Sequence, residues 1–277
     1  MAARRKKLLS PAKIFIGSVL ILIAATLGTW LLIRGIDMPV LNPQGVIAAQ
    51  EKDLIIFTLL LSVVVVVPVF VMLGLFAWRY REGNHKAEYR PDEDGNTWLE
   101  LLWWGIPILI IGILGTVTWI TTHQLDPHKT INNGAAPVRV QVVALQWKWL
   151  FLYPDQHIAS LNELRIPANT PVNFEITADA PMSAFWVPSL GSQIYAMSGM
   201  SSKLSLMADK AGTYRGANSN INGKGYADMH FNVIALASRQ DFNDWVSGIA
   251  DAESHKHLDS GVYEELAKPS EKNPVTY

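Results

Sequence analysis

The chain of 277 residues contains no cysteine. This absence excludes every disulfide, and it also excludes metal centres that depend on thiolate ligands, such as a dinuclear copper site bridged by sulfur. The formal net charge is only −1, so no strong basic field indicates a nucleic-acid partner. The sequence also shows no nucleophile–base–acid set and no glycine-rich phosphate loop. The hydrophobic pattern is therefore the first guide to function.

Charge is missing from three long stretches near the N-terminus. Uncharged runs extend over residues 14–33, 54–78 and 101–120. At about 1.5 Å per residue, a helix of each length crosses a hydrocarbon core roughly 30 Å thick. The pattern predicts a transmembrane hairpin within residues 37–123, with helices at about 51–80 and 97–123.

The first apolar run follows a basic leader, Arg4 to Lys7, which is typical of either a secretory signal or a retained anchor. The run is longer than the apolar part of most signals, and no small-x-small cleavage site follows it. We therefore expect residues 1–36 to form an N-terminal signal or anchor helix that is retained. A lipoprotein signal would need a cysteine just after the run, and the chain has none.

Positive charges are distributed unevenly around the spans. Lysine and arginine are frequent in the leader and in the loop 79–98, whereas only Arg34 and Lys52 lie between the first and second spans. The positive-inside rule then predicts that the N-terminus and this loop are cytoplasmic. Everything after His123 is expected to lie outside. The chain is thus predicted to be a multi-pass protein of a bacterial inner membrane, surrounded by lipids, with a periplasmic C-terminal domain.

From Pro137 onward, apolar and polar residues alternate as they do in half-buried strands. The predicted strands cover residues 138–142, 147–153, 164–167, 172–176, 203–207 and 231–235, and a turn is predicted at 211–213. Several short strands separated by Pro, Gly and Asn indicate a sandwich or Greek-key barrel over residues 124–238. Two short helices, at 241–250 and 262–267, are predicted in a C-terminal extension covering 239–277.

Two segments carry a specific resemblance to a known family. They are LGSQIYAMSGM, from Leu190 to Met200, and WKWLFLYP, from Trp147 to Pro154. Together with two membrane helices followed by a β-domain, they are similar to subunit II of the haem-copper terminal oxidases, in the quinol oxidase branch of cytochrome bo type. The resemblance runs from about residue 41 to residue 277. It implies a transmembrane helical hairpin, with an additional N-terminal helix, followed by a cupredoxin-like Greek-key barrel and short C-terminal helices.

The copper-bearing members of this family carry a histidine before a Ser-aromatic-aromatic-x-Pro segment, and a Cys-x3-Cys-x3-His-x2-Met loop with a glutamate between the cysteines. Aligned with this chain, these six positions fall on Ser183, Asn218, Asn220, Asn222, Tyr226 and Met229. Only Met229 keeps a copper-binding side chain, and a single thioether cannot hold copper. The resemblance therefore implies a subunit that has lost its dinuclear copper centre and carries no metal or other cofactor.

The resemblance implies a subunit of a proton-pumping quinol oxidase that has no catalytic centre of its own. Haems and the remaining copper are expected in subunit I, the main partner, with subunits III and IV as further partners and ubiquinol as the substrate of the complex. Glu100 lies at the cytoplasmic edge of the third span, where the family places the start of a proton pathway. The alternative for Glu100 is an acid that extends to the lipid headgroups.

Two other functions compete with this interpretation. A copper-bearing cytochrome c oxidase subunit is contradicted by the missing ligands, whereas a membrane-tethered β-barrel that acts as an adaptor or binding protein remains open. Trp147 falls where copper-bearing relatives place an aromatic beside the metal, and we expect it to act in packing. His255 and His257 are expected to be solvated surface residues, because no third ligand accompanies them.

Overall fold

The computed structural model describes residues 20, 24–32, 34–35, 38–82, 84, 95–250 and 257–270. Contacts divide the chain into two compact units. The helical unit comprises Met1–Met38 and Phe57–Gly112, and the β unit comprises Pro39–Ile56 and Ile113–Tyr277. Residues 24–32 are helical, but the basic leader of the predicted N-terminal helix lies outside the described residues, as does His255.

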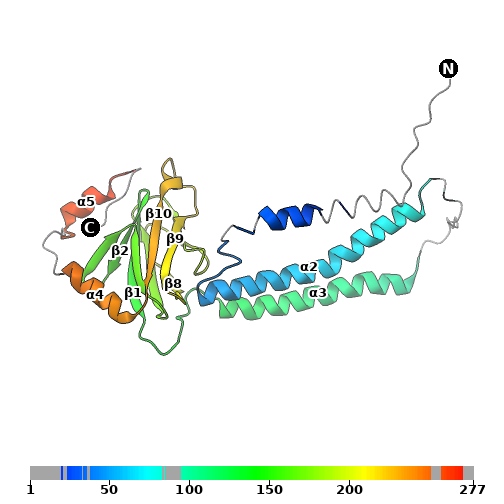
Figure 1. Ribbon diagram of the computed structural model, residues 1–277, viewed down its shortest axis with the longest axis horizontal. Coiled ribbons are helices and arrows are strands. Elements are labelled where there is room, and N and C mark those ends of the chain that lie inside the picture. The colour runs from blue at the N-terminus through cyan, green and yellow to red at the C-terminus, as the bar shows by residue number, and fades with distance from the viewer. Residues whose placement is uncertain are drawn as a thin grey trace, which may run out of the picture. The chain divides into compact units, whose positions relative to one another are not determined.

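Two described helices, α2 (Val46–Arg79) and α3 (Thr97–Gln124), are long and apolar enough to cross a membrane, judged by length and composition (Figure 1). Helix α3 begins after Asn96, whose side-chain oxygen accepts hydrogen bonds from the backbone N–H groups of Trp98 and Leu99, at 3.0 and 3.2 Å. This is an N-cap, which satisfies two donors that the first helical turn leaves free. Helix α2 begins at Val46, earlier than the predicted residue 51, and its residues up to Ile56 belong to the β unit. The backbone N–H of Ala48 donates to the carbonyl of Leu190 at 3.2 Å, which ties this end of the helix to the β unit.

The β unit contains ten strands among the described residues. They are β1 (Val138–Leu145), β2 (Lys148–Tyr153), β3 (Ile158–Leu161), β4 (Glu163–Pro167), β5 (Val172–Ala178), β6 (Ser183–Trp186), β7 (Ile194–Ala196), β8 (Ser202–Leu206), β9 (Gly212–Asn218) and β10 (His230–Leu236). One sheet has the order β3-β2-β1-β5-β8 and the other β4-β10-β9-β6-β7. Strands β1 and β5 are parallel, as are β4 and β10, and the other pairs are antiparallel. The predicted all-β domain is confirmed.

Side chains that point between the two sheets form the main core. In β1 burial alternates from Val138 to Val142: Val138, Val140 and Val142 are buried, whereas Arg139 and Gln141 are exposed. Because successive side chains of a strand point to opposite faces, this pattern places the valines on the inner face and the polar residues in solvent.

Aromatic rings fill the centre of this core. The ring of Phe185 stacks on Phe231 with centroids 5.1 Å apart, and it meets Trp149 edge-on at 5.4 Å. Phe151 and Phe174 lie next to the same ring. Each such ring buries a large apolar area and prefers these offset or edge-on contacts, so the cluster holds the two sheets together.

The predicted strand set was incomplete, and the turn predicted at 211–213 lies slightly earlier, with the chain bending at 209–211 before β9 begins. Strands β3, β6, β7 and β9 were not predicted, and Gly212 begins β9 instead of turning the chain. The glycines of β9 explain the error, since they interrupt any alternation of apolar residues. Gly216 is required there, because a Cβ at this position would lie 2.1 Å from the ring of Phe231.

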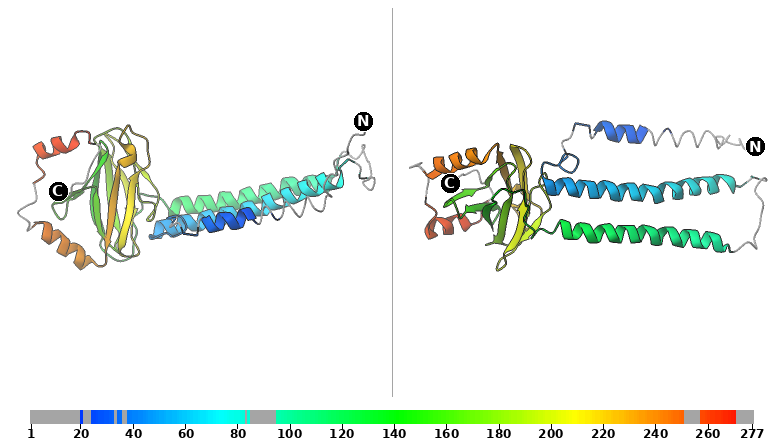
Figure 2. Two further views of the ribbon diagram at one scale, coloured as in Figure 1. Left: turned by 45° about the horizontal axis from the view of Figure 1, so that its top comes forward. Right: turned by 90° about the horizontal axis from the view of Figure 1, so that it is seen from below.

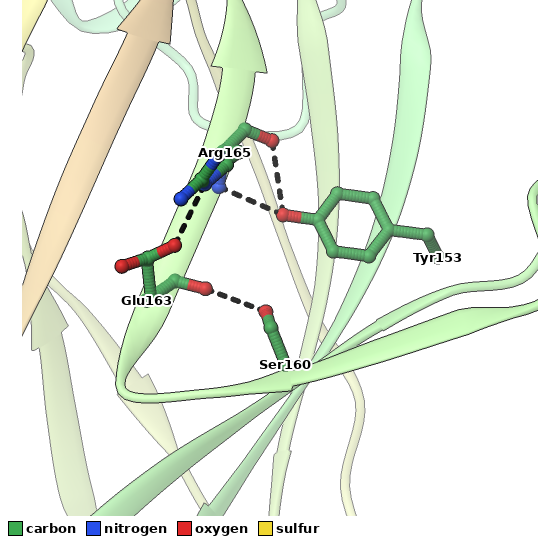
Figure 3. A network of polar contacts seen from close by, with 4 residues as sticks. All are labelled: Tyr153, Ser160, Glu163 and Arg165. Atoms are coloured by element: carbon green, nitrogen blue, oxygen red, sulfur yellow. Dashed lines mark hydrogen bonds and ion pairs between the residues drawn. The ribbon is translucent and has the colours of Figure 1, made fainter. Parts of the chain in front are cut away.

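Helix α4 (Arg239–Ala250) covers one margin of the sandwich, where a polar network ties β2 to β4 (Figure 3). The buried hydroxyl of Tyr153 donates to the carbonyl of Arg165 and accepts from its N–H, both at 2.9 Å. Burial raises the pKa of this phenol, so it stays protonated. The guanidinium of Arg165 binds Glu163 at 2.7 Å and lies 5.4 Å from the ring centre of Trp245. The network thereby connects α4 to the sheets.

Helix α5 (Ser260–Ala267) packs on the outer face of β1 and β2, on the same side of the sandwich as α4 (Figure 2). Leu266 lies in a second apolar cluster with Leu145, Leu150 and Leu161. The neighbouring Lys148 is only 4% exposed, and its Nζ donates to the carbonyl oxygen of Lys268 at 3.0 Å, just after the helix ends. Burial lowers the pKa of this lysine, but its bond to a free carbonyl at a helix C-terminus offsets part of the cost.

Candidate functional site

The six positions aligned with copper ligands lie on two segments of the β unit. Ser183 begins β6, and the other five follow from the end of β9 through a loop to the start of β10. Strands β6 and β9 are neighbours, with Phe185 opposite Asn218 and Trp186 opposite Ala217. This pairing brings the distant Ser183 against the loop.

Asn222 is the residue that joins these segments. Its Nδ2 donates to Ser183 Oγ at 2.8 Å and lies 3.8 Å from the sulfur of Met229. Ser183 and Met229 are fully buried, and the Oδ1 of Asn222 is buried without a hydrogen-bond partner. Three of the six positions are thus in direct contact, through an amide, a hydroxyl and a thioether.

Asn218 shapes the start of the loop. Its Oδ1 accepts from the N–H of Ala184 at 2.8 Å and from the N–H of Asn220 at 3.1 Å, while its Nδ2 donates to the carbonyl of Asn220 at 2.9 Å. The side chain of Asn220 points elsewhere and donates to the carbonyl of Met182 at 2.8 Å. The side chain of Asn218 therefore fixes the backbone of Ala184 and Asn220, and its amide is used in these bonds to main-chain groups.

Tyr226 lies in the short 3₁₀ turn η1 (Tyr226–Asp228) and is 36% exposed. Among the described residues, no hydrogen bond joins the side chain of Tyr226 to Ser183, Asn222 or Met229.

On the other side of the loop, the indole ring of Trp147 lies against two glycines. A Cβ at Gly225 would lie 2.5 Å from the indole ring, and one at Gly223 would lie 3.3 Å from it.

Trp147 occupies a two-residue turn between β1 and β2 with a φ of 67°, a left-handed conformation that is uncommon for a bulky residue. The close approach of its ring to the loop glycines agrees with the packing role expected for this residue. The sequence could not reveal this contact, because Trp147 and Gly225 are far apart in the chain.

His230 is the histidine nearest to the loop, and it faces away from buried Met229. Its Nε2 lies 2.7 Å from Arg215 Nη2, which donates to the neutral ring. Burial and the adjacent guanidinium lower the pKa of His230, so the imidazole is neutral at pH 7. The positive charge of Arg215 beside Nε2 would repel a metal cation that approached this nitrogen.

The donors in this loop are poorly suited to copper. Amide and hydroxyl groups are hard, weak ligands for a metal that prefers thiolate and imidazole. Among the described residues, no group of three or more His, Cys, Asp or Glu side chains is placed to hold a metal ion. The hydrogen bonds of Asn218 to Ala184 and of Asn222 to Ser183 hold the loop against β6.

Glu100 belongs to the helical unit, whereas the loop belongs to the β unit. It occupies the first turn of α3, where its backbone N–H donates to the carbonyl of Asn96 at 2.9 Å. A carboxylate in the first turn interacts favourably with the helix dipole. Glu100 can therefore stabilise α3, in addition to the predicted role in proton uptake.

Replacing Asn222 by alanine is expected to lower the free energy of unfolding by about 1–3 kcal/mol, because buried Ser183 loses a hydrogen-bond partner. Urea unfolding of the full-length chain in detergent would measure the change. Asn220→Ala is the matched control: its amide bonds a carbonyl near the surface, and we expect a change of about 0.5 kcal/mol. Equal effects of the two substitutions would contradict the bridging role of Asn222.

The fold and the loop define a class of protein: a membrane protein with a periplasmic, cupredoxin-like domain of the oxidase subunit II type. Residues 156–236 match the family described as cytochrome c oxidase subunit II, periplasmic domain, and residues 253–277 match the COX aromatic rich motif. A solved periplasmic domain of subunit II of cytochrome oxidase from Bradyrhizobium japonicum is 24% identical; the match covers 40% of this chain and 91% of that one, with a TM-score of 0.38.

Relatives that match most of the chain identify the family more closely. The cytochrome bo(3) ubiquinol oxidase subunit 2 of Pseudomonas aeruginosa is 47% identical over 247 residues, which covers 89% of this chain and 74% of the relative. The ubiquinol oxidase subunit 2 of Acetobacter aceti is 44% identical over 91% of this chain and 81% of the relative. The chain belongs to the family of cytochrome bo(3) ubiquinol oxidase subunit 2. These relatives are named as subunits of ubiquinol oxidases.

Proposed function

We propose that this chain is a subunit II without copper, which stabilises a ubiquinol-oxidising, proton-pumping oxygen reductase and carries no electrons itself. The observation that supports this most strongly is the contact of Asn222 with Ser183 and Met229. Positions that would hold copper are linked by an amide and a hydroxyl, and the cysteines needed to bridge two metals are absent from the chain.

The loss of a copper relay is consistent with the nature of the electron donor. Ubiquinol is apolar and reaches an oxidase from within the bilayer, so its electrons need no relay in the periplasm. A relay is needed when the donor is a water-soluble protein such as cytochrome c. Oxygen reduction would then take place at haems and copper held by subunit I, the principal partner.

The two apolar helices support a multi-pass arrangement in the inner membrane, with the β unit in the periplasm. Helix α3 exposes small residues, and a Cβ at Gly105 or Gly115 would meet nothing within 4 Å. Small residues let the backbones of membrane helices approach closely. We infer that this face packs against helices of subunit I, and that subunits III and IV complete the complex.

Glu100 is proposed to take part in proton uptake on the cytoplasmic side. The proposal is supported by its position: an ionisable side chain one residue before a long uncharged stretch is expensive in a membrane and is usually retained for function. A carboxylate there can accept protons from the aqueous phase and pass them to groups of the partner subunit.

The test is oxygen uptake by the purified complex, supplied first with ubiquinol and then with reduced cytochrome c. We expect rapid oxygen uptake with ubiquinol and none above background with cytochrome c. We also expect the spectrum of the complex to show no dinuclear copper signal. The proposal would be overturned by oxygen uptake that depends on cytochrome c. It would also be overturned by a dinuclear copper signal that is lost when this chain is removed from the complex.

A further inference from the structure

Three methionines lie where β6 begins and β7 ends: Met182 immediately precedes β6, Met197 immediately follows β7, and Met200 comes three residues later. The side chains of Met182 and Met200 are 43% and 57% exposed, whereas Met207 and Met229 of the same unit are buried. Amide groups lie against the sulfurs of Met207 and Met229, but within the described part of the chain no hydrogen bond engages the other three sulfurs. We call Met182, Met197 and Met200 the methionine triad.

Strand pairing places the first two methionines of the triad next to each other. Strands β6 and β7 are antiparallel, with Ser183 opposite Ala196, and Met182 and Met197 are the next residues outward from this pair. Residues that face each other in an antiparallel pair point to the same side of the sheet, with Cβ atoms about 5 Å apart. Because Ser183 and Ala196 are buried in the core, the residues next to them are directed to the outer face.

A tight turn brings the third methionine close to the other two. The backbone N–H of Met200 donates to the carbonyl of Met197 at 3.3 Å, and Gly199 between them has a φ of 77°. A positive φ at the third residue is typical of a type II turn, whose first and fourth Cα atoms lie within about 7 Å of each other. The hydroxyl of Ser198 donates to the carbonyl of Ala180 at 3.1 Å, which holds this turn against the segment that leads into β6.

Three neighbouring thioethers have a specific chemical preference. The sulfur of methionine is soft, uncharged and polarisable, and donors of this kind select Cu(I) over harder divalent ions. The methionine side chain is also unbranched and flexible, so three sulfurs whose backbones lie this close can converge on one ion. The exposure of Met182 and Met200 leaves their sulfurs open to an ion that arrives from solvent.

We propose that the methionine triad binds one Cu(I) ion reversibly through its three thioether sulfurs. None of the three methionines is among the six positions aligned with copper ligands, and Met229, the methionine of that set, is fully buried. A single Cu(I) ion has a filled d shell and gives no dinuclear copper signal. The proposed site is therefore a surface site for an exchangeable ion, and it goes beyond the proposed function without depending on it.

The test is an anaerobic titration of the full-length chain in detergent with Cu(I), in competition with a chromogenic Cu(I) chelator. Met182→Leu, Met197→Leu and Met200→Leu each remove one sulfur but conserve the volume and apolar character of the side chain, so the fold is kept. We expect each substitution to weaken Cu(I) binding by at least about tenfold, because even the loss of an outer-shell partner typically costs a metal site about 10–100-fold in affinity. X-ray absorption should show only sulfur neighbours around the bound ion.

Met72→Leu is the matched control, because Met72 is an exposed methionine of α2 outside the triad, and its replacement should leave the affinity for Cu(I) unchanged. The site would be overturned if the chain kept no Cu(I) against the chelator, which is the result expected of a patch that serves only in apolar contacts. It would also be overturned if the three triad variants bound Cu(I) as tightly as the unaltered chain. Nitrogen neighbours in the absorption spectrum would assign the ion to histidine and would likewise contradict the proposal.

Discussion

Replacing Phe185 by alanine is expected to lower the free energy of unfolding of the β-domain by about 3–5 kcal/mol. The ring is fully buried and contacts Phe231, Trp149 and Phe174, with centroids 5.1 to 5.5 Å away. Alanine removes most of this apolar contact and leaves a cavity between two sheets whose backbones are fixed by hydrogen bonding. Neighbouring rings cannot close such a cavity without losing their own contacts.

Urea unfolding of the full-length chain in detergent, followed by tryptophan fluorescence, would measure this loss. Tyr195→Ala is the matched control, because Tyr195 is an aromatic residue of the adjacent strand β7 but is 45% exposed. Its replacement should cost about 1 kcal/mol or less. A similar loss for both variants would show that the Phe185 cluster does not hold the sandwich together.

Replacing Glu100 by glutamine is expected to slow quinol-supported oxygen uptake roughly tenfold. Positioned proton-transfer groups contribute on the order of 10²-fold to rates, and water reaching the same membrane edge recovers part of the loss. Glutamine keeps the size and polarity of the side chain but can neither gain nor lose a proton near neutral pH. Stopped-flow pH measurements on vesicles containing the complex would report proton uptake directly.

Glu82→Gln is the control for this experiment. Glu82 is an exposed acid shortly after α2, on the same predicted side of the membrane but outside the spans. Its replacement should leave turnover and pumping unchanged. If Glu100→Gln also left both unchanged while the assembled complex kept its haem content, Glu100 would have only the structural role of an acid in the first turn of a helix.

Much of the fold was predictable because hydrophobic periodicity is a local signal. Val138 to Val142 alternates as a half-buried strand should, and α2 and α3 were evident as uncharged runs. Strand β6 was missed because Ser183, Ala184 and Phe185 are all buried, so a strand this short shows no alternation. Strand β9 was missed because it contains glycines at both its start and its middle.

The candidate site was predictable only as a linear pattern. The alignment identified the six positions, but it could not show that Asn222 bonds Ser183 while Asn220 and Tyr226 face elsewhere. That distinction depends on the pairing of β6 with β9 and on the turn at η1.

The docking of α5 has a consequence for how the chain matures. Synthesis and export proceed from the N-terminus, so β1 and β2 emerge long before Leu266 reaches the apolar cluster of Leu145, Leu150 and Leu161. Until then this surface stays exposed, and buried Lys148 lacks its acceptor at Lys268. A chain that ended before residue 260 would lack α5 and would leave the apolar surface of Leu145, Leu150 and Leu161 exposed to solvent on an otherwise folded domain.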